Sequence, residues 1–362
     1  MMLSAGKGFI MQSEKYSRDN AGQSLKKYIL LKKGELAYNH GASKAKQYGC
    51  CYELTEDEAR IPYVYHCFKV SGTEHTPYVA TALNNPKMDR QLKRLVSSSV
   101  RMDGLLNISF DDYMSVILRL PSLKEQTHIA VFLKKLDERI TAQEKLVESL
   151  KKYKRGLISE ILNQKIRITH EDEKWEEVSL SAVADGFEYG MNAAATIFDG
   201  VHKYIRITDI DDDSHTYIDS APVSPAGVLE GKYRVRENDI LFARTGASVG
   251  KSYLYQASDG DMYFAGFLIR IHVIDGVDSG YVFLNTLTEE YNRWVALEST
   301  RSGQPGINAE QYRRYRFKLP PLETQKQISA IAQKIDAQIK RESQCLRLLQ
   351  KQKDGFLQQL FI

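Results

Sequence analysis

The sequence has few of the residues that characterise disulfide-stabilised, metal-binding or membrane proteins. Its 362 residues include four cysteines, which form neither a C-x-x-C pair nor a cluster with histidine at metal-ligand spacing. No segment approaches the roughly 18 consecutive apolar residues of a membrane span, and the first residues lack the apolar core of a secretory signal. We therefore expect free thiols, no metal site, no membrane contact and a cytoplasmic location.

Catalytic signatures are also missing. The sequence contains no Gly-x-Ser-x-Gly turn, no His-Glu-x-x-His pair and no Asn- or Asp-Pro-Pro-aromatic motif of the kind that amino-methyltransferases use. The acidic run at residues 209–213 lacks the spaced glycine and terminal glutamate of a calcium loop, so we interpret it as a solvated turn. His40 and His66 are interpreted as packing or loop residues. No catalytic residue and no cofactor bound by this chain are expected.

One stretch, Arg244 to Tyr255, resembles a phosphate-binding loop because it contains Gly-Lys-Ser. A Walker A loop has four residues between its first glycine and the Gly-Lys pair, whereas three residues separate Gly246 from Gly250. The residues after Lys251 alternate like a strand and not like the helix whose N-terminus would face a phosphate. We therefore reject the interpretation as a P-loop ATPase.

The overall composition is that of a soluble globular protein with room for two domains. Apolar residues make up 43% of the chain, and 50 basic residues against 46 acidic ones give a net charge of +4. Such a small positive excess permits a nucleic-acid partner without requiring one. The local distribution of residues must decide.

The chain repeats itself. Leu120–Ile129 (LPSLKEQTHI) matches Leu319–Ile328 (LPPLETQKQI) at an offset of 199 residues. The same offset aligns two upstream pairs, Ile108 with Ile307 and Tyr113 with Tyr312. Further upstream, a second Gly-Ala-Ser begins at Gly41, against Gly246 in the later copy. Two modules are implied, each with a strand-rich region, a Leu-Pro turn and a long helix.

Apolar residues at three-, four- and seven-residue steps predict these long helices. A continuous helix from Glu125 to Asn163 would be about 58 Å long at about 1.5 Å per residue. Because one such helix cannot bury its apolar stripe alone, we expect the two to pair as an antiparallel coiled coil. The stripe residues that we expect at the pairing or subunit-docking surface are Leu133, Leu136, Ile140, Leu150, Ile331, Ile335, Ile339 and Leu349.

The predicted fold class is α/β (α+β), with two globular domains in tandem. The predicted boundaries are 1–119 for the first domain, 120–165 for the first long helix, 166–318 for the second domain and 319–362 for the second long helix. Strands are predicted at Tyr204–Ile210, Asp239–Ala243, Ser252–Tyr255 and Phe267–Val273, and a single helix at Tyr281–Leu297.

Polar and basic residues recur on the glycine-containing loops of both modules. Backbone N–H groups, hydroxyls and cations on such loops suit phosphate oxygens or base edges. The candidate DNA-binding residues are Asn39, Ser43, Lys44 and Lys46 in the first module, and Arg244, Thr245, Ser248, Lys251, Arg301, Ser302 and Gln304 in the second.

These features resemble the specificity (S) subunits of type I restriction-modification systems. The resemblance rests on the two Leu-Pro-x-Leu-x-x-Gln-x-x-Ile segments, the tandem repeat and the Asp-Ile-Leu-Phe-Ala-Arg-Thr-Gly segment at Asp239–Gly246. It implies that each domain recognises half of a bipartite double-stranded DNA target and that the helices set the gap between the halves. It also implies modification (methyltransferase) and restriction subunits as partners, with S-adenosylmethionine, ATP and Mg bound by those subunits.

The first module departs from this pattern. Trp175 lies 71 residues before Gly246, whereas 40 residues precede Gly41, so the first domain is shorter by roughly 30 residues. We expect it to be the less stable domain, because missing strands expose core and sheet edge. An alternative function is a truncated or silent form that serves only as a coiled-coil scaffold or a source of recognition sequence. A fused restriction enzyme is disfavoured because the methyltransferase motifs are missing.

Overall fold

The computed structural model of the chain describes residues 1–14, 28–43, 46–96, 106–168, 174–300 and 305–361. These residues form two compact units, which are described separately. Unit 1 comprises Met1–Lys145 and Glu342–Ile362, and unit 2 comprises Leu146–Arg341. Each unit mixes helices with strands and contains a part of both long helices, in accordance with the predicted tandem α/β organisation.

The strands of unit 1 form two antiparallel pairs and a central three-stranded sheet in the order β5-β4-β7. Strand β4 is buried at Leu36, Ala37 and Tyr38, as an apolar run in a central strand requires. The strands in the described residues are β1 (Met2–Ser4), β2 (Gly8–Ile10), β3 (Ile29–Lys32), β4 (Leu36–Asn39), β5 (Cys50–Glu53), β6 (Glu58–Ile61) and β7 (His66–Phe68).

Short helices of unit 1 begin at residues that cap them. These helices are α1 (Thr76–Leu83), α2 (Pro86–Leu95) and α3 (Phe110–Met114). The Asn85 side chain accepts a hydrogen bond from the Lys87 N–H at 2.8 Å, and Ser109 forms a capping box with Asp112. In the core the ring of Tyr38 stacks on that of Tyr113, with 3.8 Å between centroids.

His40 and His66 belong to this core. Their rings meet edge to face with 5.0 Å between centroids, and the His66 ring also lies 5.9 Å from that of Tyr38. The His66 Nε2 atom lies 3.0 Å from the Ile108 carbonyl oxygen. The interpretation of both histidines as packing residues is confirmed.

Unit 2 is built around a four-stranded antiparallel sheet in the order β14-β13-β16-β9. Its remaining strands form the pairs β10-β12, β17-β8 and the parallel pair β11-β15. The strands in the described residues are β8 (Glu176–Ser179), β9 (Ala184–Tyr189), β10 (Ala195–Ile197), β11 (Lys203–Ile205), β12 (Val223–Pro225), β13 (Asp239–Ala243), β14 (Ser252–Leu254), β15 (Met262–Phe264), β16 (Leu268–Val273) and β17 (Arg316–Leu319).

All four predicted strands have a counterpart, two of them one residue shorter than predicted and one much shorter. The predicted strand Asp239–Ala243 is β13, with the same bounds. The predicted strand Tyr204–Ile210 is wrong in its second half, because β11 ends at Ile205 and a 3-10 helix follows at Ile207–Asp209. The Asp209 carboxylate accepts a hydrogen bond from the Arg206 N–H at 2.8 Å, and this turn ends the strand.

The short helices of unit 2 are α5 (Leu180–Val183), α6 (Ser279–Asn285), α7 (Glu289–Ser299) and α8 (Ala309–Arg313). The predicted single helix Tyr281–Leu297 is wrong, because it is divided into α6 and α7. The Thr288 side chain accepts a hydrogen bond from the Tyr291 N–H at 3.1 Å. A threonine in this role caps a new helix and so separates it from the preceding one.

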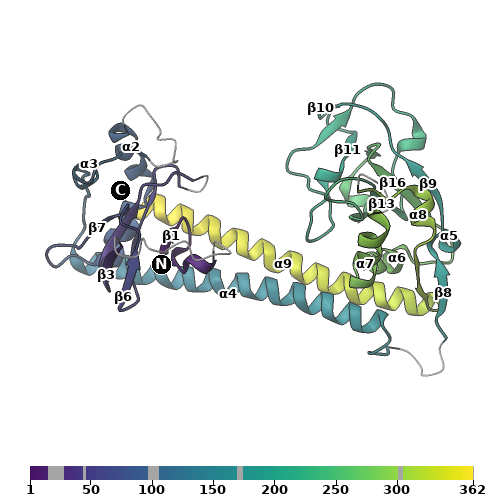
Figure 1. Ribbon diagram of the computed structural model, residues 1–362, viewed down its shortest axis with the longest axis horizontal. Helices are drawn as coiled ribbons and strands as arrows, with labels where there is room; N and C mark the ends of the chain where they lie inside the picture. Colours follow the sequence, from purple (N-terminus) through teal and green to yellow (C-terminus); the bar gives the residue numbers. More distant parts are fainter. Residues whose placement is uncertain (15–27, 44–45, 97–105, 169–173, 301–304, 362) are drawn as a thin grey trace. The chain divides into compact units, whose positions relative to one another are not determined.

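The two long helices are α4 (Leu123–Leu162) and α9 (Leu322–Leu360). In each unit a stretch of α4 lies beside a stretch of α9 (Figure 1). In unit 1 the order of contacts is antiparallel, because Asp137 binds Lys353 at 2.5 Å and the later Gln143 binds the earlier Glu342 at 2.7 Å. In unit 2 Lys154 binds Asp336 at 2.6 Å.

The predicted stripe lies on the inner side of these helices. Three of its residues in unit 1, Leu133, Ile140 and Leu349, are buried. The others are half-buried, namely Leu136, Leu150, Ile331, Ile335 and Ile339. The apolar spacing therefore correctly identified the buried faces.

The internal repeat is structural as well as sequential. Strands β4, β5 and β7 have the order and pairing of β13, β14 and β16, and helices α1 to α4 follow in the order of α6 to α9. Ser109 and Asn308 each close a capping box at the start of α3 and α8, 199 residues apart. The two units are therefore copies of one fold.

The glutamine of each Leu-Pro-x-Leu-x-x-Gln segment connects the long helix to its globular domain. Gln126 donates to the Pro121 carbonyl at 2.9 Å and accepts from the His75 N–H at 3.0 Å. Gln325 donates to the Pro320 carbonyl at 2.7 Å and accepts from the Asp278 N–H at 2.9 Å. His75 and Asp278 are the N-cap residues of α1 and α6, so the repeated motif forms a repeated brace.

Candidate nucleic-acid interface

Unit 2 contains a cleft of about 770 Å³ beside the end of β13, which we call the arginine cleft. The turn after β13, the segment that follows β9 and the end of β11 form its walls. The residues that line it are Gly190, Met191, Asn192, Ala193, Ala195, Tyr204, Arg206, Ile207, Thr208, Arg244, Thr245, Gly246, Ala247, Ser248, Ala265, Gly266 and Phe267. Three predicted DNA-binding residues, Arg244, Thr245 and Ser248, are therefore brought together in one cleft.

The floor of the cleft is a close crossing of two backbone segments. Met191 forms a parallel bridge with Ala265, and its N–H donates to the Phe264 carbonyl at 2.8 Å. A Cβ atom at Gly190 would overlap the backbone of Ala265, so this position requires glycine. The Tyr204 hydroxyl donates to the Met191 carbonyl at 2.8 Å and fixes the crossing from below.

The two arginines of the cleft are held differently. Arg206 makes two hydrogen bonds of 2.8 Å to the Asp209 carboxylate, which neutralises it. Arg244 instead lies over the ring of Tyr189, 4.9 Å from its centroid, and makes no ion pair with the described residues. Its buried Nε has no hydrogen-bond partner among them. Arg244 is thus an oriented cation available for an anionic or hydrogen-bond-accepting ligand.

The backbone on both sides of Arg244 is fixed. Its N–H donates to the Phe267 carbonyl at 3.1 Å, and its carbonyl accepts from the Ile307 N–H at 2.9 Å. Thr245 bridges Gly306. The guanidinium is consequently presented from a rigid strand end and not from a loose loop, which favours precise recognition.

One aromatic residue that lines the cleft is exposed to solvent. The Phe267 ring is 61% exposed although phenylalanine is usually buried, and it lies next to Arg244 through their shared backbone hydrogen bond. Ile197 and Val228, in the same unit, are also highly exposed. An exposed aromatic residue beside the unpaired guanidinium of Arg244 suits the stacking faces of bases as well as phosphates.

Lys251, the lysine of the Gly-Lys-Ser sequence, lies in a smaller neighbouring cleft of about 320 Å³. Its ammonium forms an ion pair with Asp212 and donates to the Ile210 carbonyl at 3.0 Å. Strand β14 begins at Ser252, as predicted, where a P-loop would continue as a helix. Lys251 therefore braces the acidic turn in this structure, and its predicted contact with DNA stays a prediction.

The acidic run forms a turn, as expected, but its carboxylates bind neighbouring groups. Asp211 accepts from the Ser214 N–H at 2.7 Å, and Asp213 binds Lys151 of α4 at 2.7 Å. Within the described ranges no cluster of three or more histidine, cysteine or acidic residues is placed to hold a metal ion. These ion pairs fasten the turn to α4 inside unit 2.

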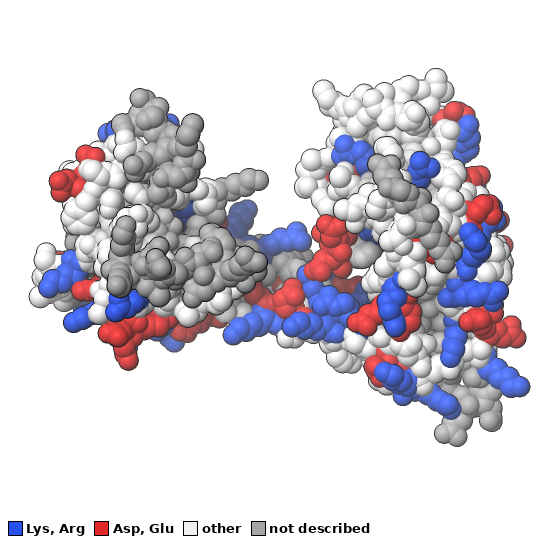
Figure 2. Space-filling view, viewed as in Figure 1, with Lys and Arg blue, Asp and Glu red and all other residues white. Residues whose placement is uncertain are grey.

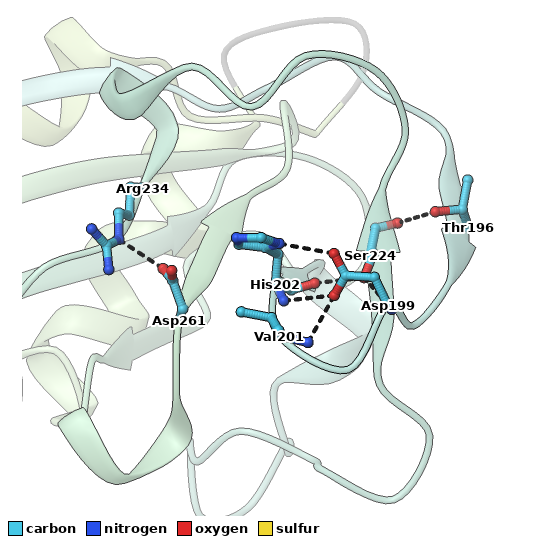
Figure 3. A network of polar contacts seen from close by, with 7 residues as sticks. All are labelled: Thr196, Asp199, Val201, His202, Ser224, Arg234 and Asp261. Atoms are coloured by element: carbon cyan, nitrogen blue, oxygen red, sulfur yellow. Dashed lines mark hydrogen bonds and ion pairs between the residues drawn. The ribbon is translucent and has the colours of Figure 1, made fainter.

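A second rigid loop in unit 2 follows β10, and Figure 3 shows its polar contacts. The Asp199 carboxylate accepts from the Val201 and His202 N–H groups and lies 2.8 Å from His202 Nδ1. These contacts, the His202 ring first, lower the pKa of Asp199 well below its usual value. Ser224 completes the network through backbone contacts, since its hydroxyl donates to the His202 carbonyl at 2.6 Å. Its hydroxyl does not face the imidazole, so this trio is not a nucleophilic triad.

A buried charge network lies under the central sheet of unit 2. Asp239 is fully buried, accepts from the Arg236 N–H at 2.7 Å and lies 2.8 Å from His272 Nδ1. Arg270 lies 3.8 Å from the same carboxylate and forms an ion pair with Glu188. Burial raises the pKa of Asp239, while its partners act in the opposite direction. The network holds β13 against β16 and is structural.

The predicted residues of unit 1 are engaged in local hydrogen bonds. The Asn39 amide oxygen accepts from the Gly41 N–H at 2.9 Å, and the Ser43 hydroxyl accepts from the Lys46 N–H at 3.0 Å. The Lys46 ammonium donates to the Asn84 carbonyl at 2.7 Å, at the end of α1. Lys44 lies outside the described residues, as do Arg301, Ser302 and Gln304 of unit 2.

Unit 2 does not present one basic face on the side that Figure 2 shows. On the side shown in Figure 2, lysine and arginine are interspersed with aspartate and glutamate over unit 2. In the part of the chain that the structure describes, no helix is both long and apolar enough to cross a membrane.

Sequence reasoning missed three residues of this site. Arg206, Tyr189 and Phe267 were not among the candidates, although each lies on or beside the cleft. Phe267 was counted as a strand residue because it begins an apolar run. A signal was present in the preceding Ala-Gly, since glycine before an apolar residue often marks a tight turn that exposes it.

Comparison with known proteins identifies the class. Residues 172–350, which include the arginine cleft, match the family described as the type I restriction modification DNA specificity domain. Over 209 residues the chain is 25% identical to the putative type I restriction enzyme MjaX specificity subunit of Methanocaldococcus jannaschii. That match covers 55% of this chain and 48% of the relative, so the chain spans about half the length of the curated relative.

Solved structures share the fold over most of the chain. A type I restriction-modification S subunit from M. genitalium aligns with a TM-score of 0.57 and 13% identity, over 91% of this chain and 83% of that one. A chain from a study of complex assembly and conformational transition of the type I R-M system aligns with a TM-score of 0.56 and 15% identity, over 92% and 82%.

Residues 172–350 thus match a DNA specificity domain. Over that region and beyond it, the chain is similar to a specificity subunit of a type I restriction-modification system.

Proposed function

We propose that this chain is the non-catalytic DNA-recognition subunit of a type I restriction-modification complex. Each unit would contact one half of a bipartite double-stranded target, and α4 and α9 would set the distance between the halves. Modification subunits would dock on the chain, and restriction subunits would join through them. S-adenosylmethionine, ATP and Mg would be bound by those partners.

The observation that carries the proposal is Arg244 in the arginine cleft. A guanidinium oriented by an aromatic ring, with no carboxylate partner among the described residues, is suited to the O6 and N7 atoms of guanine or to a phosphate. The neighbouring Phe267 offers an apolar contact. Arg206 and Lys251 each form an ion pair, with Asp209 and Asp212 respectively. We therefore infer that Arg244 is the principal cation of this cleft that is available to a ligand.

Methylation in a cell provides the test. The chain is expressed with its cognate modification subunit in a host without DNA methylation, and genomic adenine methylation is mapped. We expect methylation at a split motif, its strong reduction by Arg244→Ala, and little change for Arg293→Ala. Arg293 is a matched control because it is exposed on α7 and pairs locally with Glu290. Absence of methylation with the natural chain would favour the scaffold alternative.

Salt dependence in vitro separates a phosphate contact from a base contact. If Arg244 neutralises a phosphate, Arg244→Ala should reduce the slope of log affinity against log salt by about 1 and weaken all sequences equally. If Arg244 contacts a base, Arg244→Ala should reduce the binding free energy by about 1–3 kcal/mol for the target sequence alone. A variant indistinguishable from Arg293→Ala in both assays would refute the assignment.

A further inference from the structure

Strand β9 contains a β-bulge where it pairs with β16. The two strands are neighbours in the sheet order β14-β13-β16-β9 of unit 2 (Figure 1). Asp185 pairs with His272, and the next pair after the irregularity is Glu188 with Arg270. This interval is two residues long on β16 and three on β9, so β9 has one extra residue, at positions 186–187.

The backbone of the bulge is left-handed. Gly186 has φ of 86° and Phe187 has φ of 41°. A bulky residue rarely adopts a positive φ, and such a conformation persists only where the surrounding structure holds it. Phe187 is held because its side chain is buried in the core of unit 2 and the Arg313 guanidinium lies over its ring, 4.3 Å from the centroid. The bulge is therefore a fixed part of unit 2.

The bulge exchanges the faces of the residues that follow it. Without the extra residue, the register would place Glu188 opposite Ile269 and turn Tyr189 to the other face of the sheet. With the extra residue, Tyr189 is opposite Ile269 and shares its face. Glu188 lies instead on the face of Arg270, with which it forms an ion pair.

The face that Tyr189 shares with Ile269 is also the face of Arg244. Ile269 pairs with Phe242 of β13, and Arg244 follows two residues later on the same side of the chain. The contact agrees with this register, since the Arg244 guanidinium lies 4.9 Å from the centroid of the Tyr189 ring. The bulge thus places an aromatic ring at the position where the regular register would place the Glu188 carboxylate.

The ring of Tyr189 is itself fixed. Its hydroxyl accepts a hydrogen bond from the Ala309 N–H at 3.2 Å, at the start of α8. The buried Nε of Arg244 has no hydrogen-bond partner among the described residues. An aromatic ring attracts a guanidinium without accepting from its N–H groups in the guanidinium plane, whereas a carboxylate would accept from two of them. Tyr189 therefore orients Arg244 and leaves its donors available.

We propose that Tyr189 is a positioning residue for Arg244, and that the bulge of β9 keeps Arg244 available to DNA by directing the Glu188 carboxylate to Arg270. The inference rests on the proposed DNA contact of Arg244 and deepens it. It implies that a carboxylate at position 189 would pair with Arg244 and remove it from the DNA as effectively as truncation of Arg244 does.

Substitutions at Tyr189 test this, because deletion of a bulge residue risks unfolding the sheet. Tyr189→Glu introduces the carboxylate, Tyr189→Gln is its uncharged control of similar shape, and Tyr189→Phe keeps the ring. Each substitution is made in the full chain, once with Arg244 and once with Arg244→Ala. Affinity is measured by fluorescence anisotropy, with the modification subunit present, for a duplex that carries the split motif found by methylation mapping.

We expect Tyr189→Glu to weaken binding about 5- to 150-fold, as Arg244→Ala should, since both remove the same contact. Tyr189→Gln loses only the attraction to the ring and should weaken binding about two- to five-fold, and Tyr189→Phe should do so less than about two-fold. The difference between the Glu and Gln variants should be much smaller in the Arg244→Ala chain. An equal difference in both chains would overturn the proposal, because the carboxylate would then act on the DNA directly.

A measurement without DNA separates this inference from the proposed function. The Arg244 Nε–H signal in a proton–nitrogen correlation spectrum is identified by its loss in Arg244→Ala. Tyr189→Phe should leave this signal in place, whereas Tyr189→Gln and Tyr189→Glu should shift it, because both remove the ring. An unchanged signal in both variants would overturn the positioning role, whatever the DNA result. If no methylated motif is found, or if Arg244→Ala binds DNA like the natural chain, the proposed DNA contact fails and the signal alone decides the positioning role.

Discussion

The glutamine brace permits a matched test of how each long helix is fastened to its domain. Gln126 and Gln325 occupy the same position in the repeat, and both are at least 98% buried. Each side chain donates to a proline carbonyl and accepts from the backbone N–H of the N-cap residue of a short helix, α1 or α6, and Gln126 also donates to the Glu74 carboxylate. Alanine at either position removes these hydrogen bonds and leaves the two backbone partners unmet.

The expected loss of stability differs between the units. An unmet buried backbone group costs about 1–3 kcal/mol, less where water can reach it. In unit 2 the Pro320 carbonyl belongs to a buried residue, so we expect Gln325→Ala to destabilise unit 2 by about 3 kcal/mol. In unit 1 Pro121 and His75 are half-exposed, so we expect about 2 kcal/mol for Gln126→Ala.

Urea unfolding followed by hydrogen exchange with peptide resolution measures each unit separately. Gln325→Ala should accelerate exchange in α6 and the start of α9, and Gln126→Ala should do so in α1 and the start of α4. If both variants lost less than about 0.5 kcal/mol of unfolding free energy, the proposed role of the glutamines would be refuted, since such values are typical of surface substitutions. If one substitution accelerated hydrogen exchange equally in both units, the claim that each glutamine stabilises its own unit would be refuted.

Three further predictions concern unit 2. Gly190→Ala should disrupt the backbone crossing at Ala265 and abolish DNA binding by unit 2, as measured by anisotropy, whereas Gly231→Ala, which has open space, should not. Arg270→Met should cost about 3 kcal/mol of unfolding free energy, because it removes a cation from buried Asp239. Burial lowers the pKa of His215, so its unprotonated form is favoured in the folded state, and stability should fall as the pH drops below about 6.5.

The pH prediction has a conservative control. His215 has a left-handed backbone with φ of 55°, which asparagine tolerates better than most residues. The variant His215→Asn should keep the turn and lose most of the stability difference between pH 7.5 and 5.5 that is attributable to this group. Lys251 and Lys154 also lower its pKa, whereas Asp211 and the Ser252 carbonyl raise it. An unchanged pH dependence would refute the assignment to His215.

The long elements could be predicted from the sequence because their signals are local. The stripe from Leu133 to Ile140 and the apolar run Ile240–Ala243 of β13 are each a strong local signal. The break between α6 and α7 was missed because Thr288 acts through a single cap hydrogen bond, which the apolar pattern of the surrounding residues conceals. Strand β11 was predicted too long because the Asp209 turn competes with the ladder.

The candidate site could be predicted only in part. Arg244, Thr245 and Ser248 are adjacent in sequence, so a search for polar loop residues found them together. Whether a cation is free depends on contacts distant in sequence. Lys251 is occupied by Asp212, 39 residues earlier, and Arg244 is oriented by Tyr189. No local pattern encodes such pairings, because they arise only when strands from separate parts of the chain meet.

The repeat distinguishes the framework of each unit from the surface that varies between them. Both units keep a carboxylate at the start of the central strand, where Glu35 accepts from the Lys32 N–H at 2.8 Å and Asp239 from the Arg236 N–H at 2.7 Å. Both also keep a left-handed residue immediately before it, Gly34 or Asn238. These contacts satisfy backbone groups and do not depend on which residues project from the neighbouring loops. When Glu35 is matched with Asp239 at the start of the central strands, Arg244 aligns with His40, which is buried in an aromatic cluster, so unit 1 has no exposed cation at that position. If both units recognise DNA, they must do so with different side chains on the same framework. His40→Arg should therefore disturb the core of unit 1 without creating a second arginine cleft.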